Sequence, residues 1–229
     1  MTHIAAFLKS KRTCLAWLVL NTVAIASHAQ TTPVFDDIPT NKYHSASGKW
    51  LKASNTNCLM WDSFARESES VTWSGDVVDG KAFGKGVVQW FTNGVPTTSY
   101  EGEMREGLAD GHGIARGYGT TVEGEFKEGT PVSRITIHYP TGGWYKGESK
   151  DGFKEGQGEE VMIAGGASTR YMGQFKRDRF DGPGVMIWPN GGKVSGDWKD
   201  FKLVGSGTYT WTNGDTFKVK MTAKGIERE

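Results

Sequence analysis

One spaced pattern recurs along the chain, and this repetition constrains the fold more than any other feature of the sequence. In each copy an aromatic or apolar residue is followed two positions later by Gly, and a Gly-x-Gly pair usually follows after a short break. The copies begin at positions 73, 100, 122, 145, 171 and 194, so their spacing is 22 to 27 residues. A period of this length is typical of arrays in which each unit packs on its neighbours. We therefore expect six small repeated units.

The pattern within one copy predicts a β-hairpin. Its first half alternates with a period of two, which places side chains on opposite faces of a strand. In the fifth copy one face takes Tyr171, Gly173 and Phe175, and the other takes Met172, Gln174 and Lys176. Because this Gly has no side chain, we expect an aromatic ring from a neighbouring strand to lie over its backbone.

Glycine and asparagine mark the expected turns. The first Gly of each Gly-x-Gly is expected in a tight turn that needs a positive φ. Three Asn-Gly pairs, at Asn93-Gly94, Asn190-Gly191 and Asn213-Gly214, predict hairpin turns of two residues. The copy at position 122 has no Gly-x-Gly, which predicts a local kink or a widened hairpin.

The pattern Tyr-x-Gly-x-[Trp/Phe] followed by Gly-x-Gly resembles the MORN repeat (membrane occupation and recognition nexus) from about Trp73 to Met221. The resemblance implies an all-β fold, in which consecutive β-hairpins form one elongated, twisted, single-layer antiparallel sheet. The segment from Cys58 to Val77 also resembles the start of secreted bacterial MORN-repeat proteins. Those proteins often have a second cysteine where this chain has Val77, so the resemblance leaves the family disulfide without its partner here.

The N-terminal residues 1–29 have the features of a signal peptide. Basic residues open the chain, an apolar run covers residues 13–26, and Ser27-His28-Ala29 supplies small residues before a cleavage site at Gln30. The apolar run is too short to cross a bilayer comfortably. We expect a secreted or periplasmic protein, with an uncleaved N-terminal anchor as the alternative.

The remaining chain divides into four parts. Residues 30–47 read as a polar linker, 48–72 as an N-terminal cap segment, 73–221 as six repeats plus a terminal strand, and 222–229 as a C-terminal tail. We expect the terminal strand to end at an exposed edge, which Lys218 and Lys220 would protect against pairing with another chain. Cleavage would leave Cys58 as the one cysteine, which is either a buried thiol or a bridge between two chains.

Composition excludes some classes of protein. Hydrophobic residues at 37% and aromatic residues at 12% argue against disorder, because such a chain can bury apolar surface. A net charge of +1 lacks the basic excess that nucleic-acid binding needs. The outer faces of the hairpins carry both signs of charge, and an anionic lipid surface would need clustered Lys and Arg. Lys176, Arg177 and Arg179 come closest to such a cluster.

Aromatic residues and glycines are the candidate site residues. The aromatic set either fills the core of a thin sheet or forms a groove that stacks a sugar, a peptide or a lipid tail. This set comprises Trp90, Tyr100, Tyr145, Tyr171, Phe175, Trp188, Trp198 and Trp211. The glycines are expected to be structural, at Gly75, Gly86, Gly102, Gly113, Gly124, Gly147, Gly158, Gly173, Gly184, Gly196 and Gly207.

The sequence offers little catalytic chemistry. His44, His112 and His138 do not have metal-ligand spacing from another His or Cys, and no Gly-x-Ser-x-Gly elbow occurs. Asp79, Asp110 and Asp181 each precede or approach a Gly, which is the ordinary use of Asp in turns. We therefore expect no enzyme activity, no metal and no cofactor.

Together these features predict an exported interaction module that binds a protein or peptide partner along its sheet. Association with the envelope or with phospholipid is the alternative, and a glycan-binding protein or hydrolase is a more distant one. A homodimer also remains open, whereas nucleic acid is not expected as a partner.

Overall fold

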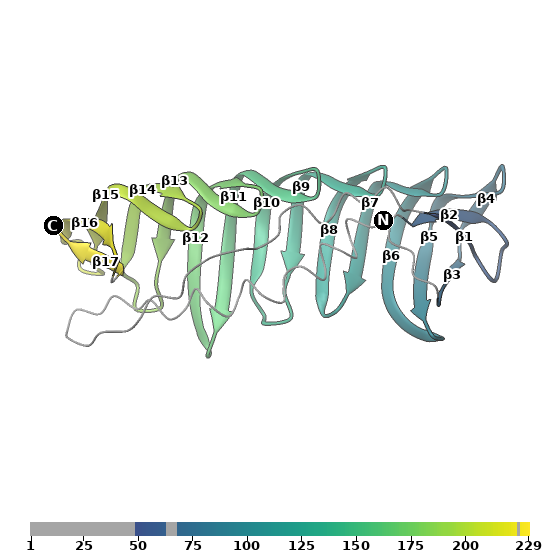
Figure 1. Cartoon of the computed structure of the whole chain (residues 1–229), viewed down its shortest axis with the longest axis horizontal. Helices are drawn as coiled ribbons and strands as arrows, with labels where there is room; N and C mark the ends of the chain where they lie inside the picture. The colour runs from purple at the N-terminus through teal and green to yellow at the C-terminus, as the bar shows by residue number, and fades with distance from the viewer. Residues whose placement is uncertain (1–48, 63–67, 224) are drawn as a thin grey trace. The chain divides into compact units, whose positions relative to one another are not determined.

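The computed structural model describes residues 49–62, 68–223 and 225–229, and most of these residues lie in strands. The expected signal peptide and linker fall outside the described residues. Within them there is no helix that could cross a membrane. Contacts divide the chain into two units, and Figure 1 labels most of the strands that they contain. The described part of the first comprises residues 49–62, 68–140 and 149–152, and that of the second 141–148, 153–223 and 225–229.

The first unit begins with short strands and continues as long hairpins. Its strands pair antiparallel in chain order from β5 to β9, while β3 and β4 both pair with β5 and β1 pairs with β2. The strands are β1 (Lys49–Lys52), β2 (Leu59–Asp62), β3 (Glu69–Trp73), β4 (Asp76–Val78), β5 (Lys81–Thr92), β6 (Val95–Arg105), β7 (Leu108–Gly117), β8 (Thr120–Lys127) and β9 (Thr130–His138).

The second unit consists of consecutive hairpins. Strands β11 to β17 pair antiparallel, each with the next in the chain. The strands are β10 (Trp144–Lys150), whose residues up to Glu148 belong here, β11 (Phe153–Ala164), β12 (Ala167–Lys176), β13 (Arg179–Ile187), β14 (Lys193–Lys199), β15 (Lys202–Thr210), β16 (Thr216–Thr222) and β17 (Gly225–Arg228). Both units thus confirm the predicted all-β fold of consecutive antiparallel hairpins.

Rows of facing glycines run across the strands of each unit. In the first unit, Gly86, Gly102, Gly113 and Gly124 lie directly opposite one another on β5, β6, β7 and β8. In the second, Gly158, Gly173, Gly184 and Gly196 do the same on β11 to β14. A Cβ at any of the eleven predicted structural glycines would come within 2.9 Å of another atom. The rows therefore leave no space for a side chain.

A tyrosine ring occupies the space above three of the pairs of facing glycines. Tyr100 lies over Gly102 and Gly113, and its hydroxyl donates a hydrogen bond to the Glu103 carbonyl oxygen at 3.0 Å. Tyr171 repeats this arrangement over Gly173 and Gly184. The expectation that the ring comes from a neighbouring strand was wrong for Gly102 and Gly173, because each tyrosine stands on the same strand as that Gly, two residues earlier. The ring reaches the neighbouring strand only at the second Gly.

The first Gly of Gly-x-Gly has the predicted positive φ but is not in a turn. Gly111 and Gly182, with φ of 115° and 113°, lie inside β7 and β13. Opposite Gly111, the register shifts between Gly102 and Met104, so the strand bulges there. The Glu103 side chain lies across Gly111, within 2.5 Å of where a Cβ would stand. Glycine is required at this bulge by both its backbone angle and the side chain above it.

The turns differ from the prediction in two places. Asn93-Gly94 is the expected two-residue turn, with Thr92 paired to Val95. Asn190-Gly191 and Asn213-Gly214 instead lie in five-residue loops, residues 188–192 and 211–215. In each loop the Asn Oδ1 accepts from the backbone N–H two residues later, which favours the wider loop. Two-residue turns also occur where no Asn-Gly signal exists, as at Arg177-Asp178 and Asp200-Phe201, where both φ are positive.

Three further expectations need correction. The strand holding Lys218 and Lys220 is not the edge of the described residues, because β17 pairs with β16 beyond it. Asp110 and Asp181 lie in strands rather than turns, whereas Asp79 does occupy a turn with a positive φ. The unit at 122 is also more regular than expected. The register of β8 and β9 shifts after Gly124 as it does after Gly102 and Gly173 in other units, and Ser133, at the position of the first Gly of Gly-x-Gly, also has a positive φ, of 58°.

A buried ion pair replaces two core positions in one hairpin of the second unit. Lys154 and Glu160 are each 4% exposed, and Lys154 Nζ lies 2.5 and 2.6 Å from the two Glu160 carboxylate oxygens. The positions equivalent to Lys154 hold Phe180 and Leu203, and both of these are buried apolar residues. The Lys154 ammonium also lies 5.4 Å from the Tyr145 ring and 5.2 Å from the Phe175 ring. Repetition in the sequence did not reveal this pair.

The glycine row gives a direct test of the facing of the strands. We expect Gly173→Val to lower the free energy of unfolding by about 1–3 kcal/mol, because its Cβ would stand 2.5 Å from Gly184 Cα and 2.6 Å from the Pro183 carbonyl oxygen. Gln174→Val, one residue later on the opposite face, should change the free energy of unfolding by about 0.5 kcal/mol or less. Urea unfolding of both variants and of the unmodified protein measures these changes. Equal losses would contradict the assigned facing.

Candidate functional site

Most of the predicted binding aromatics lie in the core. Trp90, Tyr100, Tyr145, Tyr171, Phe175 and Trp198 are all buried, with exposed fractions of 6% or less. Tyr171 stacks on Phe180 with centroids 3.7 Å apart, and it meets Phe175 and Trp198 edge-on. The Trp198 indole N–H donates to the Gly184 carbonyl oxygen at 3.1 Å. These six side chains therefore present no binding surface, which corrects the expectation of a continuous aromatic groove.

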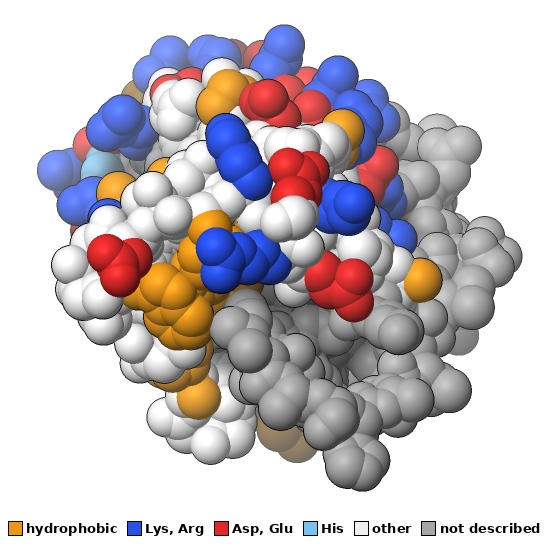
Figure 2. Space-filling view, turned by 90° about the vertical axis from the view of Figure 1, so that its left-hand side faces the viewer, with side chains coloured by type: hydrophobic (Ala, Val, Ile, Leu, Met, Phe, Trp, Pro, Cys, Tyr) orange, Lys and Arg blue, Asp and Glu red, His pale blue; other side chains and the backbone are white. Residues whose placement is uncertain are grey.

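Trp188 and Trp211 are the two predicted aromatics that remain accessible. Trp211 is 37% exposed, and Trp188 is partly exposed. Both contact Tyr209, whose ring centroid lies 6.1 Å from that of Trp188 and 4.8 Å from that of Trp211, and Phe217 packs on the other side at 5.0 Å. We call these four residues the C-terminal aromatic cluster. Figure 2 shows the molecule from the C-terminal side, where hydrophobic side chains gather on the surface beside Lys and Arg.

A second accessible apolar surface lies in the first unit. Among the described residues, ten large hydrophobic side chains are exposed, and six of them fall between positions 50 and 87. They are Trp50, Leu59, Val77, Val78, Phe83 and Val87. Strand pairing places Leu59 and Val78 on either side of Lys81, on the face that also carries Phe83, whereas Val77 is paired with the buried Ala82 and points to the other face. We call the other five the β1–β5 apolar patch. The remaining four of the ten are dispersed at Val95, Met172, Val204 and Trp211.

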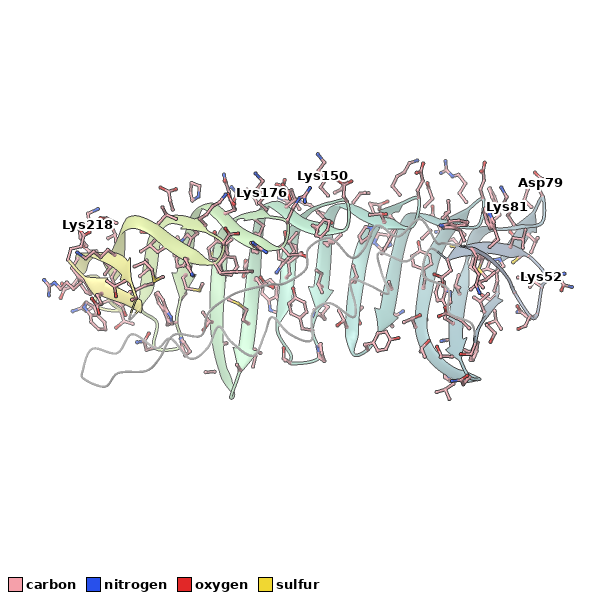
Figure 3. All side chains as sticks on the ribbon, in the orientation of Figure 1. Lys52, Asp79, Lys81, Lys150, Lys176 and Lys218 are labelled. Carbon is pink, nitrogen blue, oxygen red and sulfur yellow. The ribbon has the colours of Figure 1, made fainter. Side chains whose placement is uncertain are left out.

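The outer charges form pairs between neighbouring strands. Glu101 accepts from Arg116 at 3.2 Å, and Glu103 lies 3.7 Å from Lys85. Asp110 lies between Arg105 and Lys127 at 3.3 and 3.4 Å. Figure 3 shows many such charged side chains pointing away from the ribbon, Lys176 among those labelled. Exposed pairs of this kind contribute little to stability.

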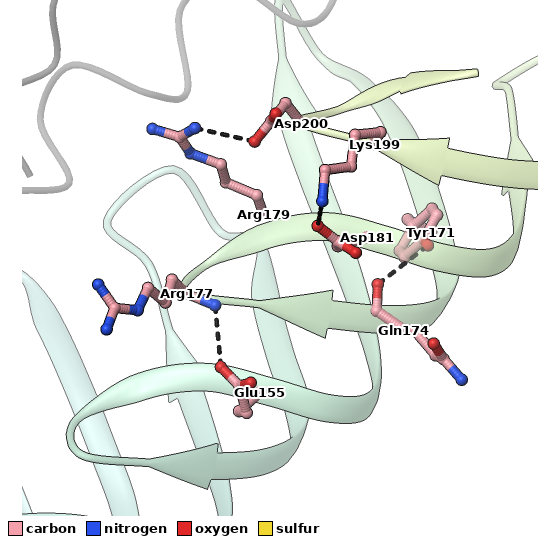
Figure 4. A network of polar contacts seen from close by, with 8 residues as sticks. All are labelled: Glu155, Tyr171, Gln174, Arg177, Arg179, Asp181, Lys199 and Asp200. Atoms are coloured by element: carbon pink, nitrogen blue, oxygen red, sulfur yellow. Dashed lines mark hydrogen bonds and ion pairs between the residues drawn. The ribbon is translucent and has the colours of Figure 1, made fainter. Parts of the chain in front are cut away.

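The basic loop at Lys176, Arg177 and Arg179 belongs to a paired network (Figure 4). Arg179 donates to the Asp200 carboxylate at 2.8 Å, and this bond holds the pKa of Asp200 below its usual value. Lys199 donates to Asp181 at 2.7 Å, which raises the pKa of Lys199. The Arg177 backbone N–H donates to Glu155. Of the three basic side chains of this loop, that of Arg179 is therefore paired with a carboxylate.

Metal-binding groups do not converge in the described part of the chain. No group of three or more His, Cys, Asp or Glu residues there could hold a metal ion. His112 and His138 lie on β7 and β9, and His44 falls outside the described residues. Cys58 is a free, fully buried thiol that accepts a hydrogen bond from the Thr56 hydroxyl at 3.1 Å. This burial agrees with the first of the two alternatives for Cys58.

Comparison with known proteins places the repeats in a family. The sequence model of the MORN repeat matches residues 73–95, 100–120, 145–165, 171–193 and 195–216. These segments begin at or beside five of the six predicted starts, and the copy at 122 is not among them. Alsin of Rattus norvegicus is 28% identical over 125 residues, and human and mouse alsin are 27% identical over the same length. The match covers 51% of this chain and only 7% of alsin.

Tyrosine burial predicts a loss of stability in alkali. Burial, together with Glu103, Glu125 and Asp110, raises the pKa of Tyr100 well above its usual value. Above pH 10 the unfolded chain ionises this tyrosine and the folded chain does not, so stability falls as pH rises. Tyr100→Phe should be less stable at pH 7, because it loses the bond to Glu103, by about 1 kcal/mol. The difference in the free energy of unfolding between the two proteins, measured by urea unfolding, should be smaller at about pH 11 than at pH 7. A difference that is the same at both pH values would contradict the prediction.

Proposed function

Because the chain is a MORN-repeat protein, we propose that it is an exported interaction module, whose β1–β5 apolar patch binds a protein partner. The repeats and their likeness to the repeat region of alsin support a binding role. The carrying observation is the group of five exposed, large hydrophobic side chains on paired strands of the first unit, with Leu59, Val78 and Phe83 on one face around Lys81.

Several features favour a protein as the partner at this patch. Soluble proteins seldom expose contiguous apolar surface without a partner, and such surfaces commonly mark protein interfaces. Trp50 packs edge-on against Trp61 with centroids 5.5 Å apart, so a large ring is held in place before binding. Lys81 lies 5.3 Å over the Trp50 ring and is itself partly exposed, which provides a polar border. A fixed aromatic residue with a polar rim is the usual anatomy of a binding hot spot.

Export rests on the N-terminal sequence alone. The basic start, the short apolar run and Ser27-His28-Ala29 support removal of residues 1–29 by a signal peptidase. We expect the intact mass of the exported protein to correspond to residues 30–229. A mature protein that retains Trp17 would contradict cleavage and would favour the N-terminal anchor.

The patch can be tested with a matched pair of substitutions. Phe83 is 43% exposed within the patch, and Val204 is 51% exposed outside it in the second unit. We expect Phe83→Lys to reduce recovery of the partner at least tenfold, because it places a charge in an apolar contact. Val204→Lys should leave recovery unchanged. Crosslinking in the native host, followed by mass spectrometry, provides the measurement.

Two outcomes would count against this site. Equal recovery with the Phe83 and Val204 variants, both folded by circular dichroism, would exclude the patch. Crosslinks from the patch only to another copy of the chain would replace the proposed heterologous partner by a homodimer, which light scattering of the purified protein would detect.

A further inference from the structure

The C-terminal aromatic cluster contains a hydroxyl that the fold does not use. Tyr209 is 1% exposed, and its hydroxyl has no hydrogen-bond partner among the described residues. The other tyrosines of the glycine rows, Tyr100, Tyr145 and Tyr171, each donate to a backbone carbonyl oxygen. A buried hydroxyl without a partner costs free energy that phenylalanine would not. The positions equivalent to Tyr209 hold residues without a hydroxyl, such as Met186 and Val88.

Two indole N–H groups in the same cluster are also unused. In the core, Trp73 donates to the Asp76 carbonyl oxygen at 2.8 Å and Trp198 donates to that of Gly184. The side chains of Trp188 and Trp211 make no hydrogen bond within the described part of the chain. Three donors, two indole and one phenolic, thus accompany the accessible rings.

Trp188 and Trp211 each begin a five-residue loop, and the two loops have the same hydrogen-bonding pattern. In the first, the Trp188 N–H donates to the Gly192 carbonyl oxygen and the Gly191 N–H donates to that of Trp188, both at 2.9 Å. The second loop repeats both bonds between Trp211, Gly214 and Asp215 at 2.8 and 3.0 Å. Asn190 and Asn213 close their loops by accepting from the backbone N–H two residues later. The loops are therefore ordered by internal hydrogen bonds before any ligand binds.

The loops lie next to each other and carry polar groups at their rims. A Cβ on Gly191 would stand 2.7 Å from Thr212 Cγ2, so the two loops are in contact. Asn190, Asn213 and Asp215 are exposed beside the rings, and the Asn213 amide donates to the Asp215 carboxylate. The Asn190 amide N–H groups and the remaining carboxylate lone pairs are then available to a ligand. Trp188 follows β13 and Trp211 follows β15, so the two tryptophan positions stand two strand spacings, or about 10 Å, apart. This separation suits one disaccharide unit.

We propose that the C-terminal aromatic cluster is a carbohydrate site, which takes a β-1,4-linked chain of pyranose rings. A pyranose with equatorial substituents has an apolar C–H face that packs on an aromatic ring. Its hydroxyl groups accept from indole and phenol donors and donate to amide and carboxylate oxygens. A site of this kind combines large rings with a few placed polar groups, as small-ligand sites do. It lies in the second unit and is independent of the β1–β5 apolar patch.

Other occupants fit the cluster less well. A lipid tail would leave the two indole N–H groups and the Tyr209 hydroxyl without partners, which costs free energy. A protein interface involves roughly 20–30 residues a side, whereas this site consists of four rings and two short loops. An extended peptide could use the same donors, and it is therefore the alternative that the experiment must separate.

Calorimetric titration of the full-length protein tests the proposal. The probes are cellotriose and N-acetylated chitotriose, with maltotriose as the α-linked comparison and a proline-rich decapeptide as the peptide probe. We expect at least one β-linked trisaccharide to bind at concentrations up to about 10 mM, which would fill a site with a Kd near 1 mM. Maltotriose and the peptide should bind at least tenfold more weakly.

Variants then locate the site. Trp188→Ala and Trp211→Ala should each weaken binding at least tenfold, and Trp50→Ala, which removes an equally exposed ring from the first unit, should leave it unchanged. Tyr209→Phe keeps the ring packing, so it should weaken binding about fivefold while the Tm stays equal or rises. A purely structural role for Tyr209 would leave affinity unaltered.

The proposal is overturned by any of three results. These are the absence of binding by both β-linked trisaccharides, binding that persists in folded Trp188 and Trp211 variants, and tighter binding of the peptide than of the saccharides. If the Phe83→Lys variant no longer binds the protein partner but still binds the saccharide, the two sites are independent of each other.

Discussion

The packing of one large side chain, most often a tyrosine, over two facing glycines is the interaction on which the hairpins depend. Tyr100 and Tyr171 each cover a pair of glycines on adjacent strands and fix a carbonyl oxygen three residues later. Without side chains in the row, the strands expose backbone that a ring can cover directly, so a sheet without a second layer obtains buried aromatic area. Where the tyrosine is absent, another apolar group takes its place, as Leu203 does over Gly196 and Gly207. The glycines and the covering side chain recur at fixed spacing in the sequence because each unit makes this contact.

That dependence explains why so much of the fold could be predicted. Alternation around Gly173 indicated a strand, and the facing of Tyr171 and Phe175 into the core follows from the same alternation. The pattern did not show which strand supplies the ring that covers each glycine. A tyrosine two residues before the glycine on the same strand and a tyrosine on the neighbouring strand are both compatible with the same repeated sequence. Turns such as Asp200-Phe201 were missed for a related reason, because their positive φ is imposed by the paired strands and not by a residue that favours it.

The candidate sites were less accessible to sequence reasoning. Trp90 and Trp211 hold the same position in the pattern, four residues after the second Gly of Gly-x-Gly, and only the structure shows that one is buried and the other exposed. Tyr209 stands out because its hydroxyl has no hydrogen-bond partner among the described residues, and the sequence alone does not show which hydroxyl groups lack a partner. The β1–β5 apolar patch arises because β4 and β5 pair and bring a valine and a phenylalanine together that are ordinary strand residues when considered singly.

The buried Lys154–Glu160 ion pair distinguishes one hairpin from the others, whose sequences are similar to its own. Hairpins of similar sequence can exchange places during folding, since each offers the next a comparable apolar surface, and such misassembly is a characteristic failure of repeat proteins. Both charges lie on β11 and move with it, but a wrong neighbour would replace the Tyr145 and Phe175 rings that lie 5.4 and 5.2 Å from the ammonium. A buried ion pair is tolerated only where the surrounding groups fit it. The pair thus penalises incorrect order in an array whose other hairpins are held by interchangeable contacts.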